Sequence, residues 1–251
     1  MEAREREVAW YYRSMMRSHY PYFVWLACSA ATATVLAART GNAQPRLGTP
    51  GQFAITAEDL TGYFAEQRKY RDVDHFKHTE TTNHFSLLFR SGGIKLGAHY
   101  FVIPSLSVGA TLGYELRTGS ITVPDGGGTY TTAKGNEWTL AFQPKVGYAL
   151  MVSDAVGFWF RLGPGVVHNS MHPAVWDRSH EVRETYWLVG LDALVAIMPV
   201  PHFGLMLGPT ADFSFAGSHG ETYWDGGARV DYDHSASYWR LGGTFGLIGA
   251  F

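Results

Sequence analysis

His84 and Ser86 are two residues apart in the stretch Asn83-His84-Phe85-Ser86. In a β-strand this spacing puts both side chains on one face, where an imidazole can take the proton of a hydroxyl and make it a nucleophile. The sequence offers no obvious carboxylate to orient the histidine, and a histidine two residues from a serine often occurs by chance. The pair is a candidate for nucleophilic catalysis, but we predict a chain without catalytic residues.

Three histidines of the stretch 168–180 are candidates for holding a metal ion: His168, His172 and His180. Their spacing is irregular, and Pro173 prevents a helix that would align the first two. The glycine-rich stretch 124–130 (PDGGGTY) lacks the lysine and the following serine or threonine of a phosphate-binding loop. The sequence therefore predicts no metal site and no cofactor, and it predicts that both stretches are outer loops.

The composition limits the possible partners. The chain has 251 residues, of which 17% are charged and 15% are aromatic, and its formal net charge is -2. Soluble domains have about 25% charged residues, so this chain is unusually apolar. It has no basic region that would match the phosphates of a nucleic acid, and nucleic acid is not an expected partner.

Residues 1–43 have the features of an N-terminal extension followed by a secretory signal peptide. Arg17 and His19 form a cationic start, residues 20–38 are apolar, and small residues precede a cleavage site after Ala43. A retained membrane anchor is an alternative, because the apolar stretch is almost long enough to span a bilayer. Cys28, the only cysteine, lies in this segment, where lipid attachment is a further possibility. We expect a mature domain of residues 44–251 without disulfide bonds.

After residue 44 apolar residues recur with a period of two, the pattern of β-strands, and no stretch keeps a helical period for three turns. Eight strands are predicted within the stretches 52–64, 94–102, 107–116, 136–150, 156–166, 185–197, 203–215 and 238–251. The first slips its register at Glu58-Asp59, which indicates a β-bulge. Short turns at 103–106, 152–155 and 199–202 alternate with long polar loops at 68–93, 118–135, 168–183 and 217–237. This alternation is typical of an up-and-down meander in a membrane barrel.

The two faces of these strands differ in a way that predicts which one meets lipid. One face is apolar, and the other carries small residues with four cations and four anions: Lys95, Lys145, Arg161, Arg240, Glu115, Glu137, Asp192 and Asp212. The outer face of a soluble barrel would carry many more charges. We therefore predict that the small face lines a narrow barrel, in which each charge needs a partner. Arg240 should face inward and meet Glu or Asp of a neighbouring strand.

Aromatic residues on the apolar face indicate two membrane interfaces. Trp138, Trp187 and Trp239 open strands that follow long loops, and four other aromatics lie near the short turns: Tyr100, Tyr148, Phe203 and Phe251. Two such rings are typical of a membrane barrel.

Three strands contain a proline, which removes a ladder donor, and we expect these residues at bulges or near the rim: Pro144, Pro164 and Pro209.

The chain resembles the small eight-stranded outer-membrane β-barrels of Gram-negative bacteria, of the OmpA and OmpX transmembrane type. The resemblance covers Gln52 to Phe251, and in the last strand it rests on alternating apolar residues: Leu241, Phe245, Leu247 and Phe251. It implies that this strand is the signal read by the barrel-assembly machinery, although Gly243 and Gly249 replace larger apolar residues. Some barrels of this size are lipid A-modifying enzymes, and one class uses a His-x-Ser pair, which would give His84 and Ser86 a role.

From these features we predict an all-β protein, an eight-stranded antiparallel up-and-down transmembrane β-barrel in the outer membrane of a Gram-negative bacterium. Side chains fill an interior of this width, so solute diffusion is not its expected role. The predicted function is non-enzymatic, structural or in surface interaction through the long outer loops. The expected partners are outer-membrane lipids and, through the strand ending at Phe251, the assembly machinery. The alternatives are a lipid-modifying enzyme and a soluble exported barrel that binds a small apolar ligand.

Overall fold

The computed structural model describes residues 46–71, 77–87, 94–124, 130–172, 181–225 and 228–251, and its regular elements are all β-strands. These are β1 (Phe53–Arg71), β2 (Lys77–Leu87), β3 (Ile94–Ile103), β4 (Leu106–Pro124), β5 (Tyr130–Met151), β6 (Val156–His172), β7 (Glu181–Val200), β8 (Phe203–Asp225), β9 (Ala228–Ser235) and β10 (Ser237–Ala250). Within these ranges no helix is long and apolar enough to cross a membrane.

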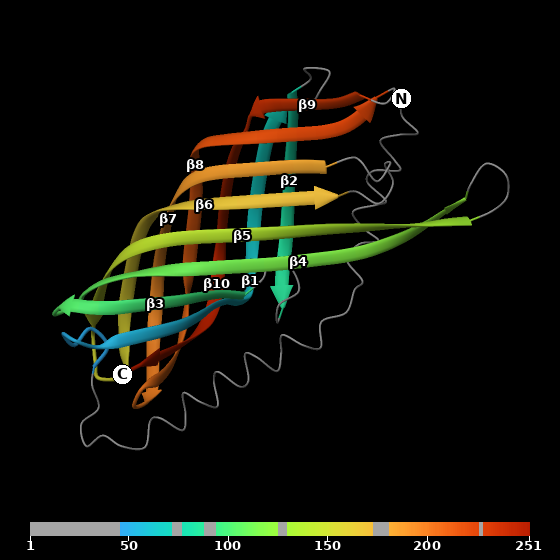
Figure 1. Cartoon of the computed structure of the whole chain (residues 1–251). Helices are drawn as coiled ribbons and strands as arrows, with labels where there is room; N and C mark the ends of the chain where they lie inside the picture. Colours follow the sequence, from blue (N-terminus) through green and yellow to red (C-terminus); the bar gives the residue numbers. More distant parts are fainter. Residues whose placement is uncertain (1–45, 72–76, 88–93, 125–129, 173–180, 226–227) are drawn as a thin grey trace.

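Eight of the strands close into a ring in which every pair is antiparallel (Figure 1). Around the ring the order is β1, β3, β4, β5, β6, β7, β8 and β10, and β10 pairs with both β8 and β1. The remaining two strands extend the ladder toward the outer end, where β2 pairs with β1 and β9 pairs with β8. The predicted eight-stranded antiparallel barrel is therefore confirmed.

The predicted outer loops are too long, because much of each one is strand. The hairpin of β4 and β5 continues to Pro124 and Tyr130, and that of β8 and β9 continues to Asp225 and Ala228. Beyond the lipid neither face of a strand has to be apolar, so the period-two signal fades while the backbone ladder goes on. The predicted short turns are confirmed, since β3 and β4, β5 and β6, and β7 and β8 follow one another closely.

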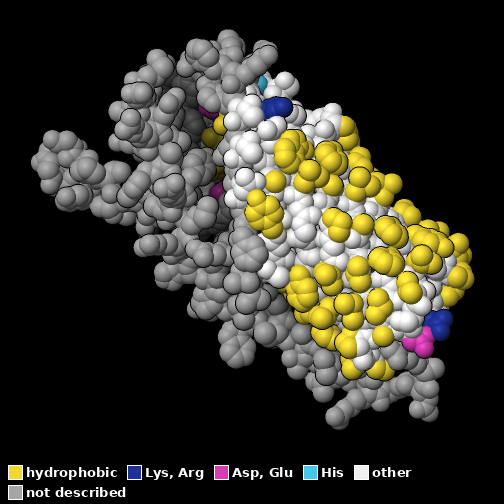
Figure 2. Space-filling view, turned by 180° about the vertical axis from the view of Figure 1, so that it is seen from behind, with side chains coloured by type: hydrophobic (Ala, Val, Ile, Leu, Met, Phe, Trp, Pro, Cys, Tyr) yellow, Lys and Arg dark blue, Asp and Glu magenta, His cyan; other side chains and the backbone are white. Residues whose placement is uncertain are grey.

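The outward face of the ring is apolar, as predicted. Figure 2 shows hydrophobic side chains spread over the wall of the barrel with few charged side chains among them. Leu112, Phe160 and Leu162 are 51%, 47% and 50% exposed in the middle of their strands, whereas the alternate residues face the lumen. An apolar band around a polar interior is the arrangement of a transmembrane barrel and excludes the soluble exported barrel.

The three predicted outer tryptophans lie on this outward face. Trp187 is 54% exposed, and the half-buried Trp239 donates its indole N–H to Gln67 Oε1 at 3.2 Å. Trp138 and Trp187, two strands apart, pair with Ser170 and Val166 of β6, four residues apart. Strands tilted by about 45° and spaced about 4.8 Å apart need an offset of roughly three residues to keep two side chains at one height. The observed offset of four residues is close to this value, so Trp138 and Trp187 lie at nearly the same height, as in an aromatic girdle.

The prolines do not lie at bulges or at the rim, which corrects that expectation. The ladder of β5 and β6 keeps one register on both sides of Pro144 and Pro164, from Phe142↔Val166 to Val146↔Leu162. The two prolines therefore face each other in mid-strand, and both are exposed on the lipid side. Pro209 also sits in a continuous register, opposite Gly243. All three prolines are exposed on the lipid side within a continuous register, although a proline is usually confined to edge strands or bulges.

The inner half of the lumen holds an apolar core. Its buried residues come from seven strands and from the segment before β1, and they are Leu47, Ala54, Phe101, Ala149, Trp159, Leu194, Ala196, Met198, Met206, Ile248 and Ala250. Trp159 is fully buried and donates to Ser107 Oγ at 3.3 Å. Side chains thus fill this part of the barrel, as expected for eight strands.

Candidate functional site

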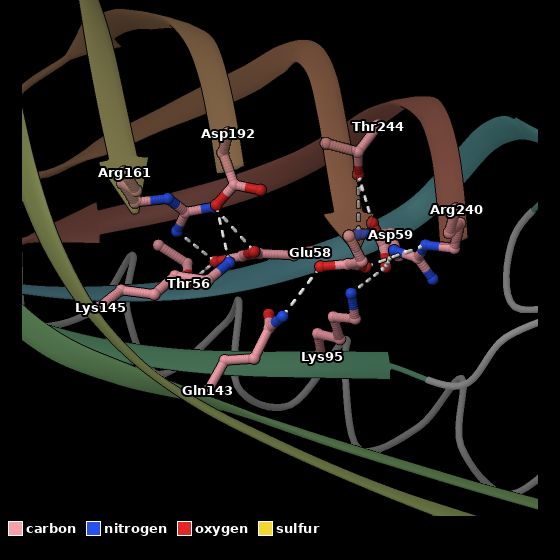
Figure 3. A network of polar contacts seen from close by, with 11 residues as sticks. Thr56, Glu58, Asp59, Lys95, Gln143, Lys145, Arg161, Asp192, Arg240 and Thr244 are labelled. Carbon is pink, nitrogen blue, oxygen red and sulfur yellow. Dashed lines mark hydrogen bonds and ion pairs between the residues drawn. The ribbon is translucent and has the colours of Figure 1, made fainter. Parts of the chain in front are cut away.

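A β-bulge in β1 turns two consecutive carboxylates into the lumen. Between Ala57 and Thr61 the register of β1 against β10 shifts, and Asp59 adopts a left-handed backbone with φ of 57°. Aspartate tolerates this conformation better than most residues do. As a result Glu58 and Asp59 are both buried, at 4% and 5% exposed, and they point into the barrel (Figure 3). The sequence predicted the bulge but not this double inward placement.

Glu58 organises the first of two groups of ion pairs, the Glu58 group (Glu58, Lys145, Arg161 and Asp192). The guanidinium of Arg161 binds Glu58 Oε2 at 2.8 Å and Asp192 Oδ2 at 2.9 Å. Lys145 Nζ lies 2.7 Å from the same oxygen of Asp192. All four side chains are almost completely buried, so their charges are screened by one another rather than by water.

Asp59 organises the second group, the Asp59 group (Asp59, Lys95, Asp212 and Arg240). Asp59 Oδ2 lies 3.2 Å from Lys95 Nζ and 3.1 Å from Arg240 Nη2. Arg240 Nε is 3.3 Å from Asp212 Oδ2. The hydroxyl of Thr244 donates to Asp59 Oδ1 at 2.7 Å and accepts from the Asp59 backbone N–H at 3.0 Å. The predicted carboxylate partner of Arg240 is thus found on both neighbouring strands.

Each of the two groups contains two cations and two anions, so each is balanced in charge by itself. Together they contain four cations and four anions from β1, β3, β5, β6, β7, β8 and β10. A buried charge without a partner is costly, so each group holds only while all its strands are in place. This arrangement stabilises the closed barrel and occupies the lumen, and it contains no exposed nucleophile.

A small polar cavity of about 90 Å³ lies next to the Asp59 group. Lys95, Gln143 and Asp212 line one part of it, and Glu66, Arg68 and Asn169 line another. Gln143 Nε2 donates to Asp212 Oδ1 at 2.8 Å, and Asn169 Nδ2 donates to Glu184 Oε2 at 3.2 Å. Such a space is large enough for several water molecules, which need polar partners of this kind.

Beyond the tryptophan level, side chains of four strands form an outer cluster (Arg68, Asn169, Glu184, His219 and Glu221). His219 Nδ1 lies 3.0 Å from Glu184 Oε1, and its Nε2 lies 3.0 Å from Glu221 Oε1. Burial disfavours the charged imidazole, but these two carboxylates raise the pKa of His219 to about 9. Burial also opposes ionisation of Glu184, yet His219, Arg68 and Asn169 hold its pKa at about 2. At neutral pH the cluster is therefore ionised and cross-links the outer strands.

The residues that the sequence offered for chemistry do not form a described site. His84 and Ser86 lie in β2, opposite Phe64 and Gly62 of β1, and their side chains are outside the described part.

Of the three histidines considered as candidates for a metal site, the two in the described part of the chain are far apart. His168 and His172 lie four residues apart in β6, a distance of about 13 Å along a strand, whereas His180 lies outside the described residues. His168 Nδ1 is 2.8 Å from Thr185 Oγ1, and His172 Nε2 is 3.8 Å from Glu181 Oε1. Among the described residues no group of three His, Cys, Asp or Glu side chains is placed to hold a metal ion.

The sequence pattern did not identify Glu58 and Asp59 as inward residues, nor any member of the outer cluster, His219 included. The signal for the first two was present, because a register slip at two adjacent carboxylates is what a bulge that turns both inward would produce. His219 fell in a stretch predicted as loop, where no periodicity assigned it a face.

The sequence matches no known family model and no curated protein. Solved structures of similar fold include the outer membrane protein OprG from Pseudomonas aeruginosa, with a TM-score of 0.50 and 10% identity over 84% of this chain and 99% of that chain. They also include the outer membrane protease OmpT from Escherichia coli, with a TM-score of 0.45 and 11% identity over 84% of this chain and 99% of that chain. Ail, the attachment invasion locus protein of Yersinia pestis, matches with a TM-score of 0.36 and 12% identity over 81% of this chain and all of that chain.

The fold is that of the small outer-membrane β-barrel proteins, which confirms the resemblance seen in the sequence. Together the closed ring of strands and its lipid-facing band place the chain in the outer membrane of a Gram-negative bacterium.

Proposed function

We propose that this chain is a non-enzymatic outer-membrane barrel with a structural or surface-interaction role carried by the outer parts of its strands. The observation that carries the proposal is the filling of the lumen. The apolar core occupies the inner half, and the Glu58 and Asp59 groups span the barrel above it. A lumen closed by paired charges and packed side chains favours a structural wall over a path for solutes.

The outer hairpins support a surface role. They continue as ladders beyond the tryptophans, and the outer cluster joins four of their strands. Lys69, Thr79, Arg183 and Asp231 are exposed there, so the outer end offers polar groups on a rigid frame. Binding sites on membrane barrels and other scaffolds are commonly displayed in this way. The proposed partners at the wall are outer-membrane lipids, and the proposed partner of the last strand is the assembly machinery.

The same experiment tests the role and the absence of enzymatic activity. A strain lacking the protein is complemented with the parent chain, with the His84→Ala/Ser86→Ala double variant, or with a chain whose residues 219–234 are replaced by a short turn. We expect identical lipid composition by mass spectrometry in all four strains, including the uncomplemented one. Adsorption of whole cells to surfaces, or resistance of the envelope to detergent, should be restored by the parent and the double variant but reduced by the shortened chain.

Three outcomes contradict the proposal. A lipid species that depends on the parent chain and disappears in the double variant would show a lipid-modifying enzyme. Full function of the shortened chain, at an equal level in the outer membrane, would remove the surface role of the outer strands. Proteoliposomes that contain the parent chain should swell in small sugars no faster than protein-free vesicles, and faster swelling would indicate a conducting lumen.

A further inference from the structure

The segment before β1, residues 46–52, lies across the inner end of the barrel rather than leading away from it. Leu47 is 2% exposed and belongs to the apolar core with Phe101 and Trp159. Its neighbours Arg46, Thr49 and Pro50 are exposed, so the segment inserts a single apolar side chain and keeps its polar side toward water. The segment therefore has one side chain in the lumen and its other side in solvent, as expected of a segment that closes the inner end of the barrel.

Hydrogen bonds fix the segment to three different parts of the inner rim. The N–H of Ser105, in the turn between β3 and β4, donates to Gly48 O at 2.8 Å. Gly51 N–H donates to Phe101 O at 2.8 Å, and Phe101 N–H donates to Gln52 O at 2.9 Å. Arg46 forms an ion pair with Asp154 in the turn between β5 and β6. The segment therefore ties turns together that are far apart in the sequence.

Two glycines allow the chain to turn inward and back. Gly48 and Gly51 have φ of 97° and 82°, a left-handed conformation that other residues adopt only with strain. A Cβ on Gly48 would also lie 3.3 Å from the Cα of Ser105. Inside this turn the N–H of Gly48 donates to Gln52 Oε1 at 2.9 Å, and Gln52 is itself buried. The sequence 46–52 is thus built to fold onto the barrel mouth.

We propose that residues 46–52 form a detachable inner plug that keeps water on the inner side of the membrane away from the apolar core of the lumen. Leu47 belongs to the same buried cluster as residues of the wall, and Gly48 lies over one of them, Ala149, whose Cβ is 3.5 Å from a Cβ built on Gly48. The bonds of Gly51 and Gln52 to Phe101 continue the ladder of β1 and β3, but the ring itself closes through pairs from Phe53 onward. The plug can therefore release these bonds and leave its place while the barrel stays closed. The plug controls access to the inner lumen, and the ion-pair groups close the lumen further out.

The test measures access to a reporter thiol beneath the plug. The full chain carrying Cys28→Ser and Ala149→Cys has one cysteine, which is labelled in lipid vesicles with a small charged thiol reagent. We expect slow labelling in this parent, and labelling at least tenfold faster after Leu47→Ala. Gln52→Met, which removes the acceptor for Gly48 N–H but keeps the volume of the side chain, should also accelerate labelling. Migration of unheated protein on gels verifies that each barrel is folded.

The matched control is Leu194→Ala, since Leu194 is an equally buried leucine of the same core but belongs to β7. It removes the same volume and leaves the plug tethered, so labelling should stay close to that of the parent. Equal acceleration by Leu194→Ala and Leu47→Ala would show general loosening of the core and overturn the proposal. Labelling of folded Leu47→Ala at the parent rate would also overturn it.

Discussion

Arg240 of β10 binds Asp59 of β1 inside the lumen, with Nη2 and Oδ2 3.1 Å apart, so an ion pair joins the two strands that close the barrel. These residues are 181 positions apart in the chain. The guanidinium carbon of Arg240 also lies 4.4 Å from the ring centre of Phe64, so the guanidinium packs on the face of this aromatic ring. The pair settles the orientation of the wall, because a lipid-facing Arg240 would have required the opposite assignment of every strand face.

Replacing Arg240 with Met keeps the packing on Phe64 but removes the charge shared by Asp59 and Asp212. Breaking a buried pair leaves an uncompensated charge, so we expect the free energy of unfolding to fall by about 3 kcal/mol. Urea titration followed by tryptophan fluorescence measures this loss. The matched control is Arg183→Met, an exposed arginine paired with Glu181, which should cost no more than about 1 kcal/mol. Similar losses in both variants would contradict a buried network.

Variants at Asp59 separate the charge from the backbone conformation. Asp59→Asn and Asp59→Ala both remove the ion pairs, but only asparagine tolerates the left-handed φ of 57° well. We therefore expect Asp59→Ala to lose roughly 1 kcal/mol more than Asp59→Asn in the same urea titration. Asp59→Gly, which accepts this φ freely, should resemble the asparagine variant. If alanine and asparagine destabilise equally, the bulge does not depend on the conformation of this residue.

The sequence revealed those parts of the fold that a period of two can encode. The alternation from Ser107 to Leu116 assigned each side chain to lipid or lumen, and the structure has the same assignment. A period of two can place only one of two neighbours inside, so the joint inward turn of Glu58 and Asp59 could not be derived from it. The sequence predicted that Arg240 pairs with a carboxylate of a neighbouring strand. It could not predict that this carboxylate is Asp59, because only the bulge turns Asp59 into the lumen.

Leu112 tests the lipid-facing band directly, because it is 51% exposed in the middle of β4. An arginine on the lipid face near the middle of a bilayer costs about 2–4 kcal/mol, and we expect this loss for Leu112→Arg in vesicles. Thr79→Arg, at an exposed position of β2 beyond the band, is the control and should change stability by less than about 0.5 kcal/mol. A neutral Leu112→Arg variant would mean that this face does not meet lipid.

The outer cluster predicts a pH-dependent contribution to stability. The pKa of His219 is raised from 6.5 to about 9 in the folded chain, so its contribution is complete below pH 6.5 and is lost as the pH rises through 9. We expect His219→Gln to be less stable than the parent by about 2 kcal/mol at pH 6 and equally stable at pH 10. Urea titrations at pH 6, 8 and 10 measure the difference. The control Ser237→Ala, an exposed substitution without a titrating group, should show a constant difference, and a constant difference for His219→Gln would refute the role of its charge.

The length of β8 determines how far from the membrane any partner meets this protein. Its 23 residues extend about 75 Å along the strand, which at a tilt of about 45° is a height of roughly 50 Å. The hydrocarbon layer takes up about 30 Å, so the end of the hairpin stands roughly 20 Å above it. In this outer part β8 is hydrogen-bonded to both β7 and β9, which restricts its bending. A partner that binds the end of this hairpin, as the proposed surface role requires, would therefore be held roughly 20 Å from the bilayer, and smaller molecules would fit into the space between them.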